Sequence, residues 1–409
     1  MNLLVFIFIA LFFLAVTDFM LLKQEKLHHY VYQFAFLLTV FLFTIKYYYG
    51  ADMYSYVKAY DMVPSPIDLI RGIGKKPPFE IGFSMFLSAS KWIGLSYWSM
   101  TAVISLMYFY AIYKLFKYIP AYKTFALFIL VILDHNLIFA THRQCIAVSF
   151  FILMYLAYVE KRYMAVGMYA LLTVLIHKSG FVYVFPALIL WGMHFRVRKV
   201  YYWFTLLLMI VLIALPLKDI LDYIVQILPL KSSAKASWFY HSVFFARIQS
   251  VLLFYSIVLM LLGFYEAKES AYKKMAVVVF LGAVSISLFY QSFASMWRLR
   301  SYFIPFFIVY LFYVVQNADK EELVDVSALI KPIKKVILHT SIGFILLYFS
   351  YMSYQSYRKM NSYPSRIYET STIFDLFFHS EEEIKKERMQ RAVRYWRFDN
   401  MQDYSNYNK

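Results

Sequence analysis

Charged residues are scarce in this chain, and acidic residues are the scarcer kind. Of its 409 residues 16% are charged, whereas a typical soluble domain carries about 25%. The low charge content excludes an ordinary soluble domain. The 41 lysines and arginines exceed the 24 acidic residues and give a net charge of +17. In a soluble protein this excess would suggest nucleic acid. Here the basic residues gather in short segments between apolar runs, so no nucleic-acid partner is expected.

Cysteine and the common catalytic motifs are also nearly absent. The single cysteine, Cys145, excludes an intramolecular disulfide framework, and its place at the start of an apolar run is typical of a packed side chain. The sequence has no glycine-rich nucleotide loop, no Cys/His spacing for zinc and no G-x-S-x-G elbow. Carboxylates are scattered along the chain. We therefore expect no metal site and no cofactor.

Long apolar runs dominate instead. Hydrophobic residues make up 62% of the chain and aromatic residues 21%, and runs near 20 residues can each cross about 30 Å of hydrocarbon as a helix. We predict an all-α, polytopic membrane protein with about twelve transmembrane helices. The N-terminal run lacks a basic n-region and a small-residue cleavage site, so we interpret it as the first span. The predicted spans are roughly 2–20, 31–49, 98–119, 124–141, 144–159, 163–177, 179–195, 199–217, 248–265, 274–291, 301–316 and 336–355.

The domain division and the topology follow from the polar segments. We predict a transmembrane domain over 1–355 and a polar tail over 356–409. Loops rich in lysine and arginine face the cytoplasm, which predicts that both chain termini lie outside. The basic loop residues are Lys23 with Lys26; Lys114, Lys117 and Lys123; Lys161 with Arg162; Arg196, Arg198 and Lys199; Lys268, Lys273 and Lys274; and Lys320 with Lys331, Lys334 and Lys335.

Residues 79–96 look like a further span, but crossing there would move every later basic loop to the wrong side. The segment is also interrupted by Lys91 and two glycines. We therefore predict a re-entrant or interfacial helix on the outer face. It lies in a long outer loop that covers about 50–97.

A first candidate group lies in "YYYGADMYSYVKAYDM", residues 47–62. Asp52, Tyr56 and Tyr60 share one helical face. A carboxylate can accept hydrogen bonds from sugar hydroxyls, and aromatic rings can stack on a sugar. The alternative is that the aspartate caps a helix and the tyrosines mark a membrane interface.

A second candidate group is basic, and it also lies on the predicted outer face. It consists of Arg143, His177, Lys178, Arg298 and Arg300. Arginine grips phosphate oxygens in a bidentate way, so two or three together indicate a diphosphate headgroup. A histidine beside that site is a candidate acid or base. The alternatives are a snorkelling arginine and a structural histidine.

Two carboxylates complete the candidates. Glu80 precedes the predicted outer helix, where it is either a site residue or simply favoured by the helix dipole. Asp134 lies within a predicted span. An acid inside a membrane is functional by default, although it can also pair with a neighbouring polar group.

Five stretches occur in an order that resembles the EpsG-like family, which groups with Wzy-type polysaccharide polymerases. They are "YGADMYSY", "FEIGF", "HRQCIAVSFFILMYLAY", "LIHKSGFVYVFPALIL" and "RLRSYF", and they span roughly residues 40–310. The resemblance implies an enzyme of the bacterial inner membrane with an outward-facing site. That enzyme would join lipid-linked oligosaccharide repeat units into exopolysaccharide, capsule or O-antigen. The matching positions are Asp52, Glu80, Arg143, His177, Arg298 and Tyr302. Lys178 and the Cys145–Ile146 pair depart from the typical pattern.

The resemblance therefore predicts a metal-independent membrane glycosyltransferase. Its donor would be a glycan on a polyprenyl (undecaprenyl) diphosphate, and a second lipid-linked unit would supply the acceptor hydroxyl. Asp52 or His177 would be the base, with Glu80 a further catalytic candidate. The residues expected to bind substrate are Arg143, Arg298, Arg300, Lys178, Tyr56 and Tyr302. Expected partners are membrane lipids, a flippase and a chain-length regulator. A flippase of the same glycans and a glycan ligase are the alternatives.

Overall fold

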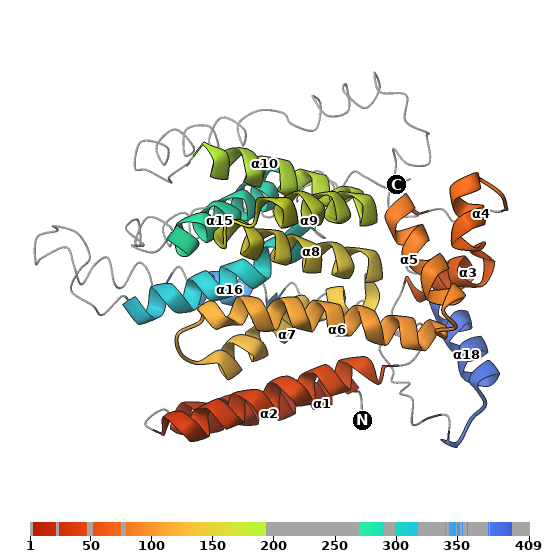
Figure 1. Cartoon of the computed structure of the whole chain (residues 1–409). Coiled ribbons are helices and arrows are strands. Elements are labelled where there is room, and N and C mark those ends of the chain that lie inside the picture. The colour runs from red at the N-terminus through yellow and green to blue at the C-terminus, as the bar shows by residue number, and fades with distance from the viewer. Residues whose placement is uncertain are drawn as a thin grey trace, which may run out of the picture. The chain divides into compact units, whose positions relative to one another are not determined.

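The computed structural model is all-helical in the part of the chain that it describes (Figure 1). That part comprises residues 3–21, 24–46, 52–74, 79–193, 270–289 and 299–317, residues 343–348 with a few positions near them between 340 and 358, and residues 375 and 377–394. By internal contacts the chain forms two units. Unit 1 is Met1–Phe181 with Ser350–Lys409, and unit 2 is Val182–Phe349.

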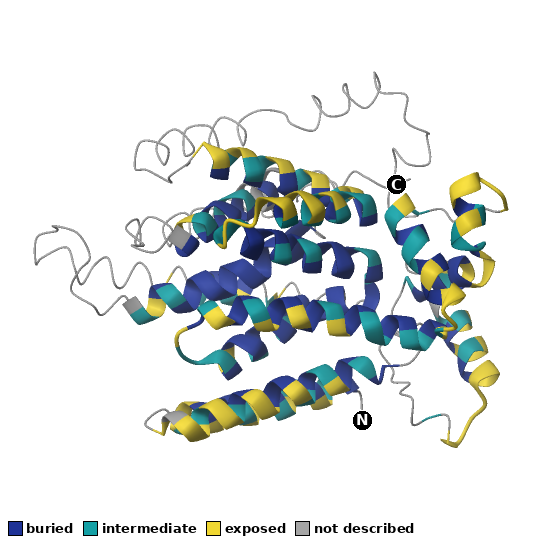
Figure 2. Ribbon diagram, viewed as in Figure 1, coloured by how far each residue is buried: buried dark blue, intermediate teal, exposed yellow. Residues whose placement is uncertain are grey.

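Unit 1 begins with a pair of contacting helices, α1 (Leu3–Met20) and α2 (Glu25–Thr44). Asp18 near the end of α1 is buried and pairs with His28 in α2. This pairing lets α2 begin in a polar stretch, about six residues before the predicted start of the second span. Both helices expose phenylalanines along their outer faces, as expected for lipid contact (Figure 2).

Three short helices connect α2 to α6 (Tyr97–Leu115): α3 (Met53–Met62), α4 (Pro66–Arg71) and α5 (Ile81–Trp92). The Ser65 side chain accepts a hydrogen bond from the Asp68 N–H at the start of α4, and Gly72 ends that helix in the left-handed conformation. With 12 residues, α5 is about 18 Å long and cannot cross the hydrocarbon core by itself. Its depth in the membrane stays a prediction.

The centre of unit 1 is built by α6, α7 (Lys123–Ala140), α8 (His142–Val159) and α9 (Tyr163–Ile176), with the 3₁₀ turns η1 (Phe116–Tyr118) and η2 (Lys178–Gly180). The helix α8 is the most deeply buried of the four candidate spans. By length and composition these spans are Leu3–Met20, Lys26–Thr44, Tyr97–Tyr118 and His142–Val159 in the described part of the chain. The apolar helices identify a membrane protein, and the count of about twelve spans stays a prediction.

Unit 2 contains α10 (Phe181–Gly192), α15 (Ser270–Phe289) and α16 (Arg300–Asn317). Helices α15 and α16 pack closely, because a Cβ on Gly282 would come within 2.2 Å of the Phe303 ring. The Trp191 indole N–H donates to the Lys274 carbonyl at 3.0 Å and joins α10 to α15.

The C-terminal helix α18 (Glu381–Arg394) packs on α3 in unit 1. Lys385 forms an ion pair with Asp61 at 3.0 Å, while Ile384 and Arg388 are buried. Because α18 contacts α3, this helix of the predicted polar tail lies beside the loop between α2 and α6. The predicted division into 1–355 and 356–409 is not tested by this contact.

Candidate functional site

Glu80 is the centre of a cluster of charged side chains in unit 1. Its Oε2 lies 2.6 Å from Arg143 Nη1, and its Oε1 lies 3.2 Å from His177 Nδ1. The same Oε1 accepts a longer hydrogen bond, of 3.4 Å, from the Lys178 backbone N–H. The three side chains are 11–19% exposed, so solvent reaches the cluster. We call Glu80, Arg143 and His177 the Glu80 cluster.

Two glycines allow the backbone to bring these side chains together. The residue Gly82, in the first turn of α5, lies against α9, and a Cβ there would come within 2.7 Å of the Leu175 backbone. This close approach holds Glu80, immediately before α5, near His177, immediately after α9. On the other side, a Cβ on Gly180 would come within 2.6 Å of the Thr173 side chain. That contact folds η2 back toward the end of α9.

Arg143 reaches the cluster from the first turn of α8. Only Thr141 separates α7 from α8, so the basic turn seen in the sequence is itself helical. A helix N-terminus is positive and disfavours the cations of that turn. The Glu80 carboxylate offsets this cost. The nearby carboxylate also explains why helix α8 can begin with the basic sequence "HRQ".

Aromatic rings cover the rest of the arginine. Arg143 Cζ lies 4.5 Å from the Phe79 ring centroid and 6.0 Å from that of Tyr56, distances at which a guanidinium is attracted to the ring faces. The Tyr56 ring stacks on His142 at 4.9 Å. Arg143 Nε is itself buried and makes no hydrogen bond in the described structure.

The pKa of Glu80 reflects these contacts. Burial alone would raise the pKa of the carboxyl, but the hydrogen bond with His177 and the charge of Arg143 bring it well below its ordinary range. Glu80 is therefore an anion at neutral pH. Because an anionic carboxylate can only accept, His177 Nδ1 carries the proton that it shares with Glu80.

The structure thus brings together five of the nine predicted site positions, the Glu80 cluster with Lys178 and Tyr56, and it changes how the last two contribute. Lys178 contributes its backbone N–H to Glu80, whereas its side chain is exposed. Tyr56 is buried against Arg143 and His142, and sugar stacking by its ring stays a prediction.

The structure describes three of the other four predicted positions, each within its own unit. Asp52 precedes α3, where its backbone carbonyl accepts from the N–H groups of Ser55 and Tyr56 and its side chain makes no capping hydrogen bond. Arg300 and Tyr302 are buried at the start of α16 in unit 2, with Tyr302 stacked on Tyr183 at 5.2 Å. Arg298 lies outside the described residues.

The sequence did not single out Lys46, which is buried just after α2. Its ammonium donates to the Ile138 carbonyl near the end of α7 and lies 5.7 Å from the Phe139 ring centroid. A lysine at the outer end of an apolar run is a signal that could have found it. Its contact supports the end of α7 one turn before Arg143.

The buried Asp134 is accounted for by its local geometry and by a tyrosine partner. It breaks the regular geometry of α7, with φ −129° and ψ 17°. The Tyr108 hydroxyl donates to its carboxylate at 3.5 Å. Of the two interpretations left open by the sequence, pairing with a polar neighbour is the one that this geometry favours.

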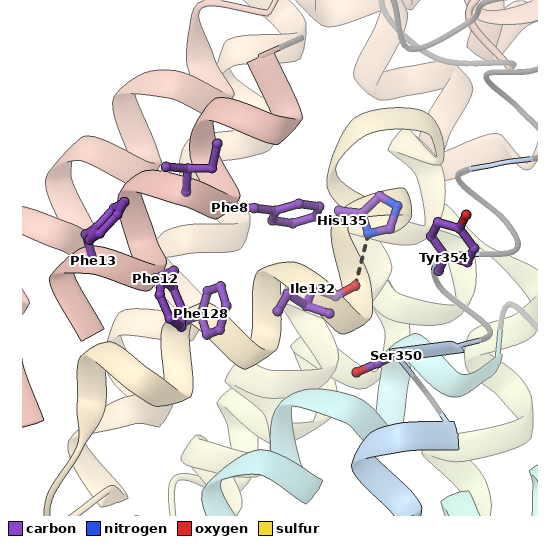
Figure 3. Close-up of a pocket in the computed structure, with 9 residues that line it drawn as sticks. Phe8, Phe12, Phe13, Phe128, Ile132, His135, Ser350 and Tyr354 are labelled. Atoms are coloured by element: carbon purple, nitrogen blue, oxygen red, sulfur yellow. Dashed lines mark hydrogen bonds between the residues drawn. The ribbon is translucent and has the colours of Figure 1, made fainter. Parts of the chain in front are cut away.

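A separate apolar hollow lies between α1, α7 and the two residues Ser350 and Tyr354 (Figure 3). Its volume is about 400 Å³, and its lining includes Phe8, Phe12, Phe13, Phe128, His135 and Tyr354. His135 Nδ1 lies 3.1 Å from the Ile132 carbonyl oxygen. Charged side chains gather around Glu80 and not around this hollow, so we place the candidate site at the Glu80 cluster.

Within the described ranges no three His, Cys, Asp or Glu side chains form a group able to hold a metal ion.

The chain matches the model of a known protein family. The model of the EpsG family matches residues 29–365 of this chain, a range that contains every member of the Glu80 cluster. No curated protein and no solved structure matches the chain.

Proposed function

Because this chain belongs to the EpsG family, we propose that it polymerises lipid-linked oligosaccharide repeat units into a polysaccharide. The family is associated with polymerases of the glycosyltransferase kind, and the apolar helices match a membrane-bound enzyme. The observation that carries the proposal is the contact of Glu80 with both His177 and Arg143. This arrangement places a candidate base and a candidate phosphate ligand on opposite oxygens of one carboxylate.

In the proposed reaction, His177 is the base. Glu80 accepts from Nδ1, which fixes the tautomer so that Nε2 takes the proton. The proton comes from the acceptor hydroxyl as its oxygen bonds to the anomeric carbon of the donor. The bond between that carbon and the diphosphate oxygen breaks, and the diphosphate leaves with the electron pair. Glu80 remains an anion and stabilises the imidazolium that forms. Of the two bases left open by the sequence, this geometry favours His177 over Asp52.

Arg143 has two roles in the proposal. Its Nη1 holds Glu80 in place, and its other N–H groups face the developing charge on the leaving diphosphate. Lys178 remains a proposed ligand of the same diphosphate, and binding of substrate by Arg298 and Arg300 stays an expectation from the sequence. The donor is a polyprenyl diphosphate glycan, and the reaction takes place at the outer face of the bacterial inner membrane without a metal. A flippase and a chain-length regulator are the proposed partner proteins.

The test compares Arg143→Ala and His177→Ala with a matched control, Arg162→Ala. Arg162 also pairs with a glutamate, Glu160 at 2.5 Å, but both side chains are more than half exposed. In cells we expect the first two variants to retain single repeat units at the outer face, with long glycans lost. The control should give glycans of normal length.

Two other outcomes would sink the proposal in favour of its rivals. Accumulation of lipid-linked units that still face the cytoplasm would identify a flippase. Full-length glycan that remains on its lipid carrier would identify a ligase. Purified protein given lipid-linked repeat units provides the direct check, because only a polymerase lengthens the glycan in that assay.

A further inference from the structure

The loop between α2 and α6 exposes large apolar side chains that a water-facing loop would bury. Five of them, each more than half exposed, are Ile67, Ile70, Ile73, Trp92 and Ile93. We call these five residues the isoleucine surface. Single exposed apolar residues are ordinary, but five of them in two contacting helices and the turns that follow exceed scattered exposure and suggest an interaction site.

The local geometry holds these side chains outward. Ile67 and Ile70 are three residues apart in α4 and share one helical face, while Leu69 between them is buried. The left-handed turn at Gly72 directs the chain on to Ile73. At the end of α5, Trp92 and Ile93 precede a second left-handed turn at Gly94.

The two helices form one tied unit. Helix α4 packs on α5, and the Ser88 hydroxyl in α5 donates to the Pro64 carbonyl at 2.5 Å. Lys91 donates to the Asp61 carbonyl at 2.7 Å. The isoleucine surface is therefore carried by a braced hairpin of helices and not by a loose loop.

We propose that the isoleucine surface inserts into the lipid leaflet on the side of the membrane where the Glu80 cluster lies. Its composition is that of a membrane interface, with aliphatic side chains, a tryptophan and the exposed cations Arg71 and Lys91 beside them. Those cations suit the phosphates of lipid headgroups.

Chain length also favours lipid over a protein partner as the occupant. Trp92 is five residues from Tyr97, where a candidate span begins. Five residues reach at most about 18 Å, so the surface cannot move far from the membrane. A lipid leaflet is the partner that lies within that distance at all times.

Insertion has a consequence for the site. Glu80 immediately precedes α5, so the leaflet that holds the end of α5 also sets the depth of the Glu80 cluster. We place the cluster near the lipid phosphates, within the length of α5, about 18 Å, from the end that the leaflet holds. The Glu80 cluster can then meet a lipid-linked diphosphate without lifting the lipid from the membrane. This role rests on the proposed function, whereas the insertion of the isoleucine surface is independent of that function.

The experiment measures the depth of single fluorophores in phosphatidylethanolamine–phosphatidylglycerol nanodiscs. The native Cys145, which is buried, is replaced by alanine in every variant. An environment-sensitive fluorophore is then attached in Ile70→Cys, Ile73→Cys and Trp92→Cys. Lys58→Cys is the control, because Lys58 is exposed on the polar face of α3 in the same loop.

We expect lipid nitroxides to quench the three test positions several-fold more than position 58, and aqueous iodide to give the reverse order. Test positions that behave like position 58 lie in water and overturn the inference. Test positions shielded from both quenchers contact protein and overturn it as well. Turnover is not read in this experiment. If the fluorophores lie in lipid but the protein fails to polymerise glycan in a separate assay, the proposed function is contradicted and the insertion is not.

Discussion

The Glu80 cluster and the two buried side chains Lys46 and Asp134 lie in the same unit but differ in access and in what neutralises them. The cluster joins charges to one another and is partly exposed. Lys46 and Asp134 are almost fully buried, and their described partners are a backbone carbonyl and a tyrosine hydroxyl.

The difference indicates which ionizable groups are able to react. A carboxylate that shares its oxygens among an arginine, a histidine and a backbone N–H can keep its charge while a proton moves on the histidine. An ammonium held by a helix carbonyl supports that helix, and solvent hardly reaches it. Inside a membrane protein, burial together with a backbone partner therefore points to support, and shared charges near solvent point to chemistry.

The largest effect is expected for Glu80→Gln. Glutamine keeps the size of the side chain but removes the charge that orients His177 and neutralises Arg143. We expect polymerisation to fall by about 100-fold or more. Because Arg143 is then partly buried without its counter-ion, the unfolding free energy should fall by about 2 kcal/mol. Glycan length and thermal unfolding in detergent measure the two effects.

The matched control for that variant is Glu160→Gln, which breaks an exposed pair with Arg162. We expect a loss below about 0.5 kcal/mol and normal glycans. Equal effects of the two substitutions would show that the Glu80 cluster is no more than an ordinary surface ion pair.

Gly82→Ala tests how the cluster is assembled. The added methyl group would lie 2.7 Å from the Leu175 backbone, so α5 must move away from α9 and carry Glu80 from His177. We expect a loss of about 1–3 kcal/mol together with shorter glycans. Gly167→Ala in α9 is the control, because no heavy atom lies within 4 Å of its Cβ. Its stability should stay the same or rise by less than about 1 kcal/mol. Normal glycan length in Gly82→Ala would mean that close packing of α5 on α9 is not needed.

Acid provides a smaller and graded effect. The folded-state pKa of Glu80 lies below the ordinary value of 4.5, so its contribution to stability is fully present above pH 4.5. That contribution is lost progressively as the pH falls toward the folded pKa. The wild type should therefore lose more stability than Glu80→Gln when thermal unfolding is followed from pH 6 to pH 3.5. If stability falls with pH equally in the two proteins, the pairing of Glu80 with Arg143 and His177 is not formed in solution.

The smallest effect is expected for Lys46→Met. An apolar side chain of similar length removes the buried charge and leaves the packing largely unchanged, so stability should change by about 1 kcal/mol or less in either direction. Glycan length should be normal. A loss of polymerisation as large as that of Glu80→Gln would break the distinction between the two regions.

Apolar periodicity and run length predicted the helices of unit 1 well where tertiary contacts do not alter the ends. The predicted spans 2–20 and 98–119 correspond to α1 and α6. The second span was predicted at 31–49, and α2 is Glu25–Thr44. Hydropathy could not find that start, because the polar beginning of α2 is stabilised by the pairing of His28 with Asp18 in the preceding helix.

The candidate site, too, could be predicted only in part from the sequence, because tertiary contacts assemble it. Residue type and predicted sidedness selected Glu80, Arg143 and His177, but the sequence did not show that Glu80 contacts both of the others. That contact depends on Gly82, which lets α5 approach α9, and a short window around "FEIGF" contains no sign of α9. Lys46 was missed because its partner is a backbone carbonyl, which has no residue-type signal.

The docking of α18 on α3 has a consequence for how the protein is made. The ion pair between Lys385 and Asp61 joins residues 324 positions apart, so α3 leaves the ribosome long before its partner exists. The cover over α3 can close only after α18 itself has been made. A chain that stops early, or whose tail is cut, leaves that face of α3 bare.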